Sequence, residues 1–300
     1  MASLRQIRRR IGSVKNTQQI TRAMKMVAAA KLRRSQERIH AARPFADKLA
    51  EVMQSLARRS EHLEHPLLEA RPVRRRLLVP ITSDKGLCGS YNSNVLRILV
   101  ERMSAGADGN GEAPEVATVP IGRKGRDFCL LRGYPVEREF TGNFGRMDYD
   151  LAKAVGEYFI SEFLEGRADE VVLIYNRFVS AITQRVTVET LLPIAPLPVA
   201  EAEPEGAEAD AGYEPDFLYE PSPERVLEGL IDRHLFTQMY RVILDADASE
   251  HGARMTAMEN ATNNSADMIA SLTLLFNRTR QAAITKEIIE VVSGADALSG

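Results

Sequence analysis

The sequence contains no tryptophan, and aromatic residues make up only 6% of its 300 residues, so an aromatic-rich core is not expected. Its two cysteines, Cys88 and Cys129, lie far apart and form no CxxC pair. This spacing favours two reduced thiols over a disulfide or a redox pair. The chain also lacks the run of about 20 apolar residues that a membrane-spanning helix needs, and no apolar stretch follows its basic start. The sequence therefore predicts neither a transmembrane helix nor a signal peptide.

Two stretches of the sequence each lack charged residues of one sign, and the sign differs between them, although the formal net charge of the chain is only −2. The first 36 residues contain ten Lys or Arg and no Asp or Glu, whereas residues 201–220 contain eight Asp or Glu and no Lys or Arg. A basic stretch of this kind can be a solvated face, can bind an acidic protein, or can bind nucleic-acid phosphates. The aromatic residues typical of single-strand binding are absent from it.

Proline and glycine are scarce at the start of the chain, which predicts one long helix from residue 2 to about residue 57. Only Gly12 and Pro44 interrupt this stretch, and Pro44 is expected to bend the helix or mark an irregularity. The helix begins with apolar residues at heptad spacing, which form a seam for a partner helix. Polar residues then occupy the seam positions, so the apolar stripe is expected to resume on a neighbouring line of the helix surface. The first part of the seam is Leu4, Ile7, Ile11 and Val14, and the shifted stripe is Ile20, Met24 and Val27.

The C-terminal stretch from Pro223 to about residue 293 predicts a second, longer helix, with Ser222 as its N-cap. Its apolar residues recur with helical spacing, as in Met258, Leu272 and Phe276. Both helices are too long for a compact domain, and each carries a stripe that needs covering. We therefore expect them to pair antiparallel, with the C-terminal helix extending past the N-terminal one.

Strands alternate with helices between the two ends, which predicts an α/β domain. Strands are expected at 76–82, 115–121, 135–140, 170–179 and 185–192, and helices at 92–103, 123–131 and 151–163. The fold class is thus α/β with long helical extensions: an antiparallel coiled coil of the terminal helices plus a Rossmann-like central domain. The expected boundaries are 1–60 for the first helix, 74–195 for the α/β domain, 196–221 for an acidic Pro/Glu-rich loop and 222–300 for the last helix.

No arrangement typical of a catalytic, nucleotide or metal site is found in the sequence. The segment from Ser83 to Gly89 lacks the spacing of a phosphate-binding loop, and residues 122–125 are too short for a dinucleotide fingerprint. His62 and His65, with two neighbouring glutamates, are better explained as a polar turn than as a metal cluster. We therefore expect no cofactor and no catalytic residue.

Five segments carry a resemblance to the gamma subunits of F-type ATP synthases, and they follow the family's order over nearly the whole chain. Residues 11–31 read IGSVKNTQQITRAMKMVAAAK, and residues 82–94 read TSDKGLCGSYNSN. Near the other end, residues 217–221 read FLYEP, residues 250–264 read EHGARMTAMENATNN, and residues 277–287 read NRTRQAAITKE. The enlarged acidic loop departs from the family pattern. The cysteine-bearing insertion of chloroplast relatives is not evident, and no transit peptide is seen, which favours a bacterial type.

The resemblance implies a non-catalytic rotor that couples proton-driven rotation of a membrane ring to ATP synthesis or hydrolysis, and that influences ATPase regulation and proton flow. The implied partners are the alpha and beta subunits, an epsilon subunit and the membrane c-ring, at the cytoplasmic face of the bacterial plasma membrane. A basic coiled-coil protein that binds nucleic acid is the alternative. The residues expected to contact a beta subunit are Arg280, Gln281, Arg8, Arg9, Met24, Lys25, Arg33 and Arg34. A low-charge tip expected to act as a bearing consists of Ile284, Ile288, Val291 and Val292.

Overall fold

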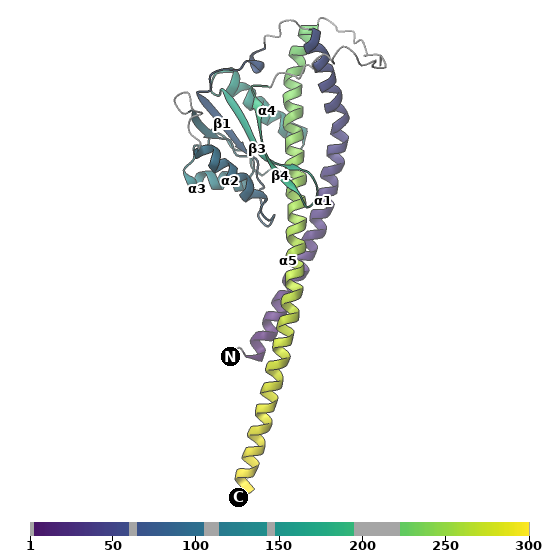
Figure 1. Ribbon diagram of the computed structural model, residues 1–300, viewed down its shortest axis with the longest axis vertical. Coiled ribbons are helices and arrows are strands. Elements are labelled where there is room, and N and C mark those ends of the chain that lie inside the picture. The colour runs from purple at the N-terminus through teal and green to yellow at the C-terminus, as the bar shows by residue number, and fades with distance from the viewer. Residues whose placement is uncertain (1–2, 60–64, 105–113, 143–147, 195–222, 300) are drawn as a thin grey trace, which may run out of the picture. The chain divides into compact units, whose positions relative to one another are not determined.

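The computed structural model describes residues 3–59, 65–104, 114–142, 148–194 and 223–299. It divides into two compact units, one made of residues 1–30 and 254–300 and the other of residues 31–253. Two long helices, α1 (Leu4–Arg59) and α5 (Pro223–Ser299), contribute residues to both units (Figure 1). The predicted acidic loop at 196–221 and the predicted N-cap Ser222 lie outside the described residues. No helix in the described part of the chain is long and apolar enough to cross a membrane.

A four-stranded sheet in the order β2-β1-β3-β4 forms the centre of the unit made of residues 31–253. Strand β1 (Arg75–Pro80) pairs in parallel with β2 (Glu115–Thr118) and β3 (Glu170–Phe178). Strand β4 (Gln184–Leu192) runs antiparallel to β3. Mostly parallel strands joined by helices agree with the predicted Rossmann-like domain.

Alternate residues of the sheet face two separate apolar clusters, as the two-residue period of a strand requires. Leu77 and Leu173 belong to the cluster on one face, with residues of α4 (Tyr149–Leu164), α1 and α5. Leu78 and Ile174 belong to the cluster on the other face, with residues of α2 (Tyr91–Ser104) and α3 (Arg123–Arg132). The sheet is therefore covered by helices on both faces (Figure 1).

Two glycines with positive φ bound helix α3. Gly122 precedes the helix with φ 98°, and its N–H donates to the Phe140 carbonyl at 2.8 Å. Gly133 ends the helix in the left-handed conformation with φ 69°, and its N–H reaches the last-turn carbonyls of Cys129 and Leu130. Glycine is favoured at both positions because a Cβ disfavours positive φ.

The predicted strand at 135–140 is wrong in part: the structure has only isolated bridges there, from Val136 to Thr118 and from Phe140 to Ile121. A proline and alternating charges limit this segment to occasional pairing. Pro44 lies inside α1 without ending it. His65, assigned to a polar turn, caps a short 3-10 helix, η1 (Pro66–Leu68), by accepting from the Leu67 N–H at 3.2 Å.

The unit made of residues 1–30 and 254–300 is an antiparallel pair of helical segments. Thr21 of α1 contacts Thr262 of α5, and Lys25, one turn later, contacts Glu259, one turn earlier. Helix α5 continues past the N-terminal end of α1, as predicted (Figure 1). Antiparallel pairing is the geometry expected when a domain returns the chain to its starting point.

The predicted phase slip in the α1 seam is wrong. Ile20 and Val27, which were expected to continue the seam, are 59% and 58% exposed. Instead the heptad spacing continues unbroken from the first apolar residues through polar ones, all buried or half-buried: Leu4, Ile7, Ile11, Val14, Gln18, Thr21, Lys25 and Ala28. Polar side chains can hold seam positions because, as described below, two of them have bonding partners on α5.

Candidate partner-binding face of the helix pair

Hydrogen bonds and an ion pair join the polar part of the seam. The hydroxyl oxygens of Thr21 and Thr262 lie 2.8 Å apart, and the Thr262 hydroxyl also donates to the Met258 carbonyl at 2.7 Å. The Lys25 ammonium lies 2.6 Å from a carboxylate oxygen of Glu259. Thr21 and Lys25, which enter this seam from α1, therefore each meet a polar group of α5, which lowers the cost of placing them there.

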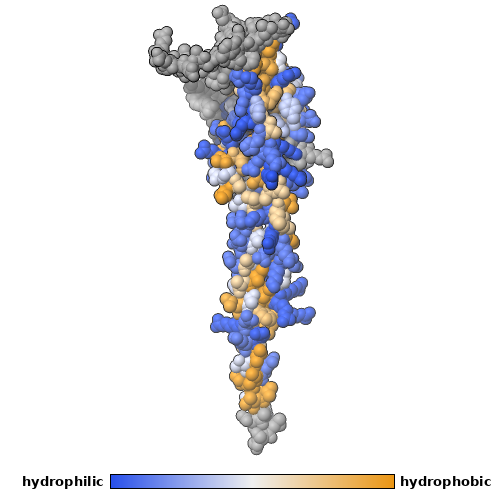
Figure 2. Space-filling model, turned by 90° about the vertical axis from the view of Figure 1, so that its right-hand side faces the viewer, coloured by the Kyte–Doolittle hydropathy of each residue, from blue (hydrophilic) through white to orange (hydrophobic). Residues whose placement is uncertain are grey.

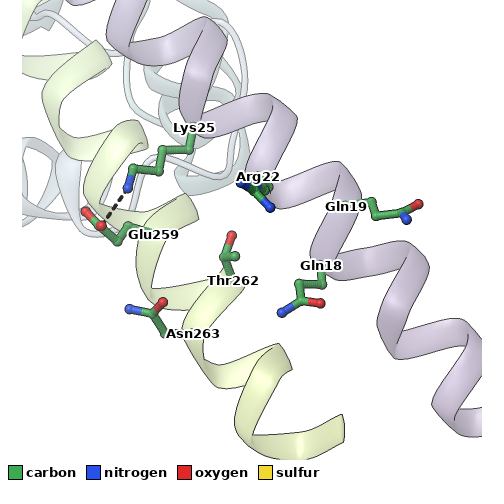
Figure 3. A pocket seen from close by; sticks show the side chains of 7 residues that line it. All are labelled: Gln18, Gln19, Arg22, Lys25, Glu259, Thr262 and Asn263. Carbon is green, nitrogen blue, oxygen red and sulfur yellow. Dashed lines mark hydrogen bonds and ion pairs between the residues drawn. The ribbon is translucent and has the colours of Figure 1, made fainter.

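A polar groove of about 360 Å³ lies beside these contacts. Figure 3 shows Lys25 reaching across to Glu259 while Gln18 and Arg22 project from α1 around the same space. The full lining is Gln18, Gln19, Arg22, Lys25, Glu259, Thr262 and Asn263. Because amide, guanidinium and carboxylate groups line it, the groove suits polar partner side chains better than an apolar ligand.

The basic residues predicted to face a partner have different surroundings. Arg8 stacks over the Phe276 ring at 5.5 Å, and Lys25 is held by Glu259. In the other unit, Arg33 forms an exposed pair with Glu37 at 3.1 Å, one helical turn away. Arg9 and Arg34 are exposed on α1. Sequence reasoning missed Glu259, whose only signal was its place in the motif at 250–264.

Apolar side chains lie exposed on α1 among these basic residues. Ile20, Met26 and Val27 are 59%, 62% and 58% exposed, and Met24 is half-buried. A cluster of exposed large apolar side chains beside positive charges is typical of a protein-binding surface. Two of the three residues expected to fill the seam, Ile20 and Val27, are thus available to a partner.

The C-terminal part of α5 exposes all the residues predicted to act there. Arg280 and Gln281 are exposed, and the last half-buried residue of the seam is Ala283. Ile284, Ile288, Val291 and Val292 are 48%, 57%, 71% and 54% exposed. Figure 2 shows apolar side chains gathered at this end of the helix, just before the grey terminal residues. Nothing within this unit covers them in the described part of the chain.

The Lys25–Glu259 pair allows a quantitative test of the seam. Both side chains are partly exposed, at 37% and 47%, so we expect a coupling free energy of at most about 1 kcal/mol in a double-mutant cycle with alanine. The free energies of unfolding of the wild type, both single variants and the double variant give this value. Coupling should shrink in 1 M salt, because the pair is reachable by ions. Coupling that is large and independent of salt would contradict the contact as described.

Among the described residues, no group of three His, Cys, Asp or Glu side chains is placed to hold a metal ion. The two helices present hydrogen-bonding and charged side chains together with exposed apolar side chains. Its chemistry is therefore that of an interaction surface.

Comparison with known proteins agrees with the residues and the fold. The family model described as ATP synthase matches residues 3–298. The chain is 48% identical to the ATP synthase gamma chain of Moorella thermoacetica and 47% identical to that of Anaeromyxobacter sp., each over 99% of this chain and 100% of the relative. Among solved structures, it resembles a chain of the Tetrahymena thermophila mitochondrial ATP synthase central stalk and c-ring, with 31% identity, a TM-score of 0.57, and coverage of 81% of this chain and 99% of that one.

A second solved structure supports the fold alone. A chain from the Euglena gracilis mitochondrial ATP synthase is 22% identical, with a TM-score of 0.68, over 98% of this chain and 94% of that one. The full-length family match and the full-length relatives lead to one conclusion: the chain belongs to the family of ATP synthase gamma chains.

Proposed function

We propose that this chain is the rotor of an F-type ATP synthase, which couples proton-driven rotation of a membrane ring to ATP synthesis and hydrolysis at the beta subunits. As a gamma chain it is the non-catalytic central stalk of that complex. Its partners are the alpha and beta subunits around the helix pair, and an epsilon subunit and the c-ring beside the α/β domain. The complex places it at the cytoplasmic face of the bacterial plasma membrane. Through the same contacts it influences ATPase regulation and proton flow.

The observation that carries this proposal is the exposed C-terminal end of α5. Its seam ends at Ala283, yet exposed isoleucines and valines continue to Val292. Exposed apolar side chains in such number need a surrounding protein. A sleeve formed by other subunits would cover these side chains without holding the helix at one rotational angle, because apolar contacts lack the directionality of hydrogen bonds. The exposed Ile20 and Val27 on α1 are explained in the same way.

Replacing Arg280 by alanine should slow ATP synthesis by the assembled complex about tenfold, the effect of losing one charge-assisted hydrogen bond to a beta-subunit carboxylate. The ATP synthesis rate of membrane vesicles, normalised to the amount of assembled complex, measures this. Arg278→Ala is the matched control: Arg278 is also exposed, but two residues along a helix place it on nearly the opposite side. Normal synthesis with Arg280→Ala, or an equal loss with Arg278→Ala, would refute the assigned contact.

The rotor proposal itself is tested by cross-linking the chain to neighbouring subunits. Ile288→Cys, combined with a cysteine introduced at the facing position of an alpha or beta subunit and oxidised with a mild oxidant, should form a disulfide between the subunits and stop ATP hydrolysis until the link is reduced. Full hydrolysis with the link intact, under conditions where the link is complete, would argue against a rotating shaft. The nucleic-acid alternative gains no support from the relatives.

A further inference from the structure

A second cavity, of about 380 Å³, lies within the unit made of residues 31–253, and none of the residues predicted to contact a partner lines it. Residues of three elements line it: α1, the end of β3 and α5. Its volume falls in the range of roughly 300–1,000 Å³ that is usual for ligand pockets. Nothing in the rotor role uses this cavity.

Three arginines from three different elements line this pocket together with one carboxyl group. The guanidinium groups of Arg43, Arg177 and Arg241 all act electrostatically on Asp245, which lies on α5. Arg241 is already engaged, because it pairs with Glu189 and bonds the Gln238 amide oxygen. Among the described residues, the side chains of Arg43, Arg177 and Asp245 form no hydrogen bond and no ion pair within 4 Å.

Burial raises the pKa of the Asp245 carboxyl, although the nearby arginines act to lower it. Burial holds this carboxyl group in the pocket wall, where it competes with an incoming anion for the same guanidinium groups. The other titratable groups along the wall are His40 and Asp47, both exposed on α1, and Tyr240 of α5, while Glu189 of β4 also acts on Asp245. Two guanidinium groups that line one cavity from different elements, without side-chain hydrogen bonds of their own, suit an oxyanion, because each can donate two parallel hydrogen bonds.

The rest of the pocket is apolar and larger than a bare oxyanion needs. Ile39 and Tyr240 are half-buried in its wall, Leu244 is buried, and Phe178 and Val179 line the β3 side. An apolar wall beside a few converging polar groups is typical of a site that orients an organic molecule. We propose that this pocket binds an organic oxyanion, with its phosphate or carboxylate group between Arg43 and Arg177 and its aromatic or apolar body against Phe178 and Tyr240.

The absence of tryptophan from the sequence gives a clean reporter. Val179 is 59% exposed and lines the pocket, so Val179→Trp places the only indole of the full-length chain at the site. Phenyl phosphate, inorganic phosphate and phenol are titrated into this variant, and calorimetry on the wild-type chain checks that the reporter does not create the site. Saturable binding of phenyl phosphate is expected, about tenfold tighter than inorganic phosphate because the ring adds buried apolar area.

Single substitutions distinguish a defined site from general attraction to positive charge. Arg43→Ala and Arg177→Ala should each weaken phenyl phosphate binding at least about fivefold. Asp245→Asn should tighten it severalfold, because a neighbouring negative charge is removed. Arg97→Ala, at an exposed arginine of α2 outside the pocket, should change nothing. The proposal is overturned if binding does not saturate, if inorganic phosphate or phenol binds as tightly, if Asp245→Asn has no effect, or if Arg97→Ala weakens binding equally.

Discussion

Replacing Gly122 by alanine should lower the free energy of unfolding by about 3 kcal/mol or more, the largest effect expected for a glycine-to-alanine change among the described residues. A Cβ at Gly122 would overlap the Thr82 carbonyl oxygen and lie 2.7 Å from its carbonyl carbon. The obstacle is backbone, so it cannot rotate away. Moving Thr82 would also disturb its N–H bond to the Ile121 carbonyl at 2.8 Å and the bond its hydroxyl accepts from the Gly125 N–H at 2.7 Å.

Gly133 provides the matched control for this prediction. It also has a positive φ, 69°, but a Cβ there would meet nothing within 4 Å. Gly133→Ala should therefore cost only the strain of the left-handed conformation, about 1–2 kcal/mol. Urea unfolding of both variants, followed by circular dichroism, gives the two values. Equal costs would show that φ alone, and not the Thr82 backbone, requires glycine at position 122.

The close approach of α4 to α5 predicts the second large effect. A Cβ at Gly156 would lie 2.5 Å from Cδ1 and 2.9 Å from Cε1 of the Phe236 ring, and 3.1 Å from a Leu235 methyl carbon. Phe236 is 9% exposed, so its ring has little room to move. Overpacking of this kind should cost Gly156→Ala about 2 kcal/mol in free energy of unfolding, even though alanine is the better helix former.

Gly229, within α5, allows the opposite outcome to be tested with the same substitution. It is exposed, and a Cβ there would meet nothing within 4 Å. Gly229→Ala should therefore raise the free energy of unfolding by about 0.5–1 kcal/mol through helix propensity.

Adding Phe236→Leu to Gly156→Ala should recover part of the loss in free energy of unfolding caused by Gly156→Ala, and a double-mutant cycle measures the coupling between the two positions. Stabilisation by Gly156→Ala would mean that α4 and α5 are not in contact there.

The sequence predicted the helices and most strands because their signals are local. Scarce proline and glycine and a helical apolar period define α1 and α5, and the apolar run at Val171–Ile174 defines β3. The segment at 135–140 was harder, because a short alternation cannot reveal whether a neighbouring strand is long enough to pair with it. In the structure, β2 ends at Thr118 and leaves it only isolated bridges.

The seam of α1 shows why the candidate site was less predictable than the fold. Hydrophobicity alone assigned Ile20 and Val27 to the interior, because the seam positions Gln18 and Thr21 are polar. In the structure, Thr21 and Lys25 lie in the seam instead. Their interior position depends on Thr262 and Glu259, which are more than 230 residues away in the sequence. No local pattern in α1 contains that information. The exposed positions of Arg280 and Gln281 agree with expectation, but the partner that they contact stays a prediction.

The polar contacts in the seam also oppose sliding of one helix along the other. A slip of seven residues, roughly 10.5 Å, would keep every apolar seam position facing another seam position. It would place Thr21 opposite Ile269 and Lys25 opposite Ala266, seven residues on from Thr262 and Glu259, so that a hydroxyl and an ammonium lose their partners together. In the other unit, Ser35 would lose the buried bond it donates to Asp247. A helix pair under an axial load therefore resists displacement by seven residues. Contacts between apolar residues alone would allow that displacement, because they would be replaced by equivalent contacts.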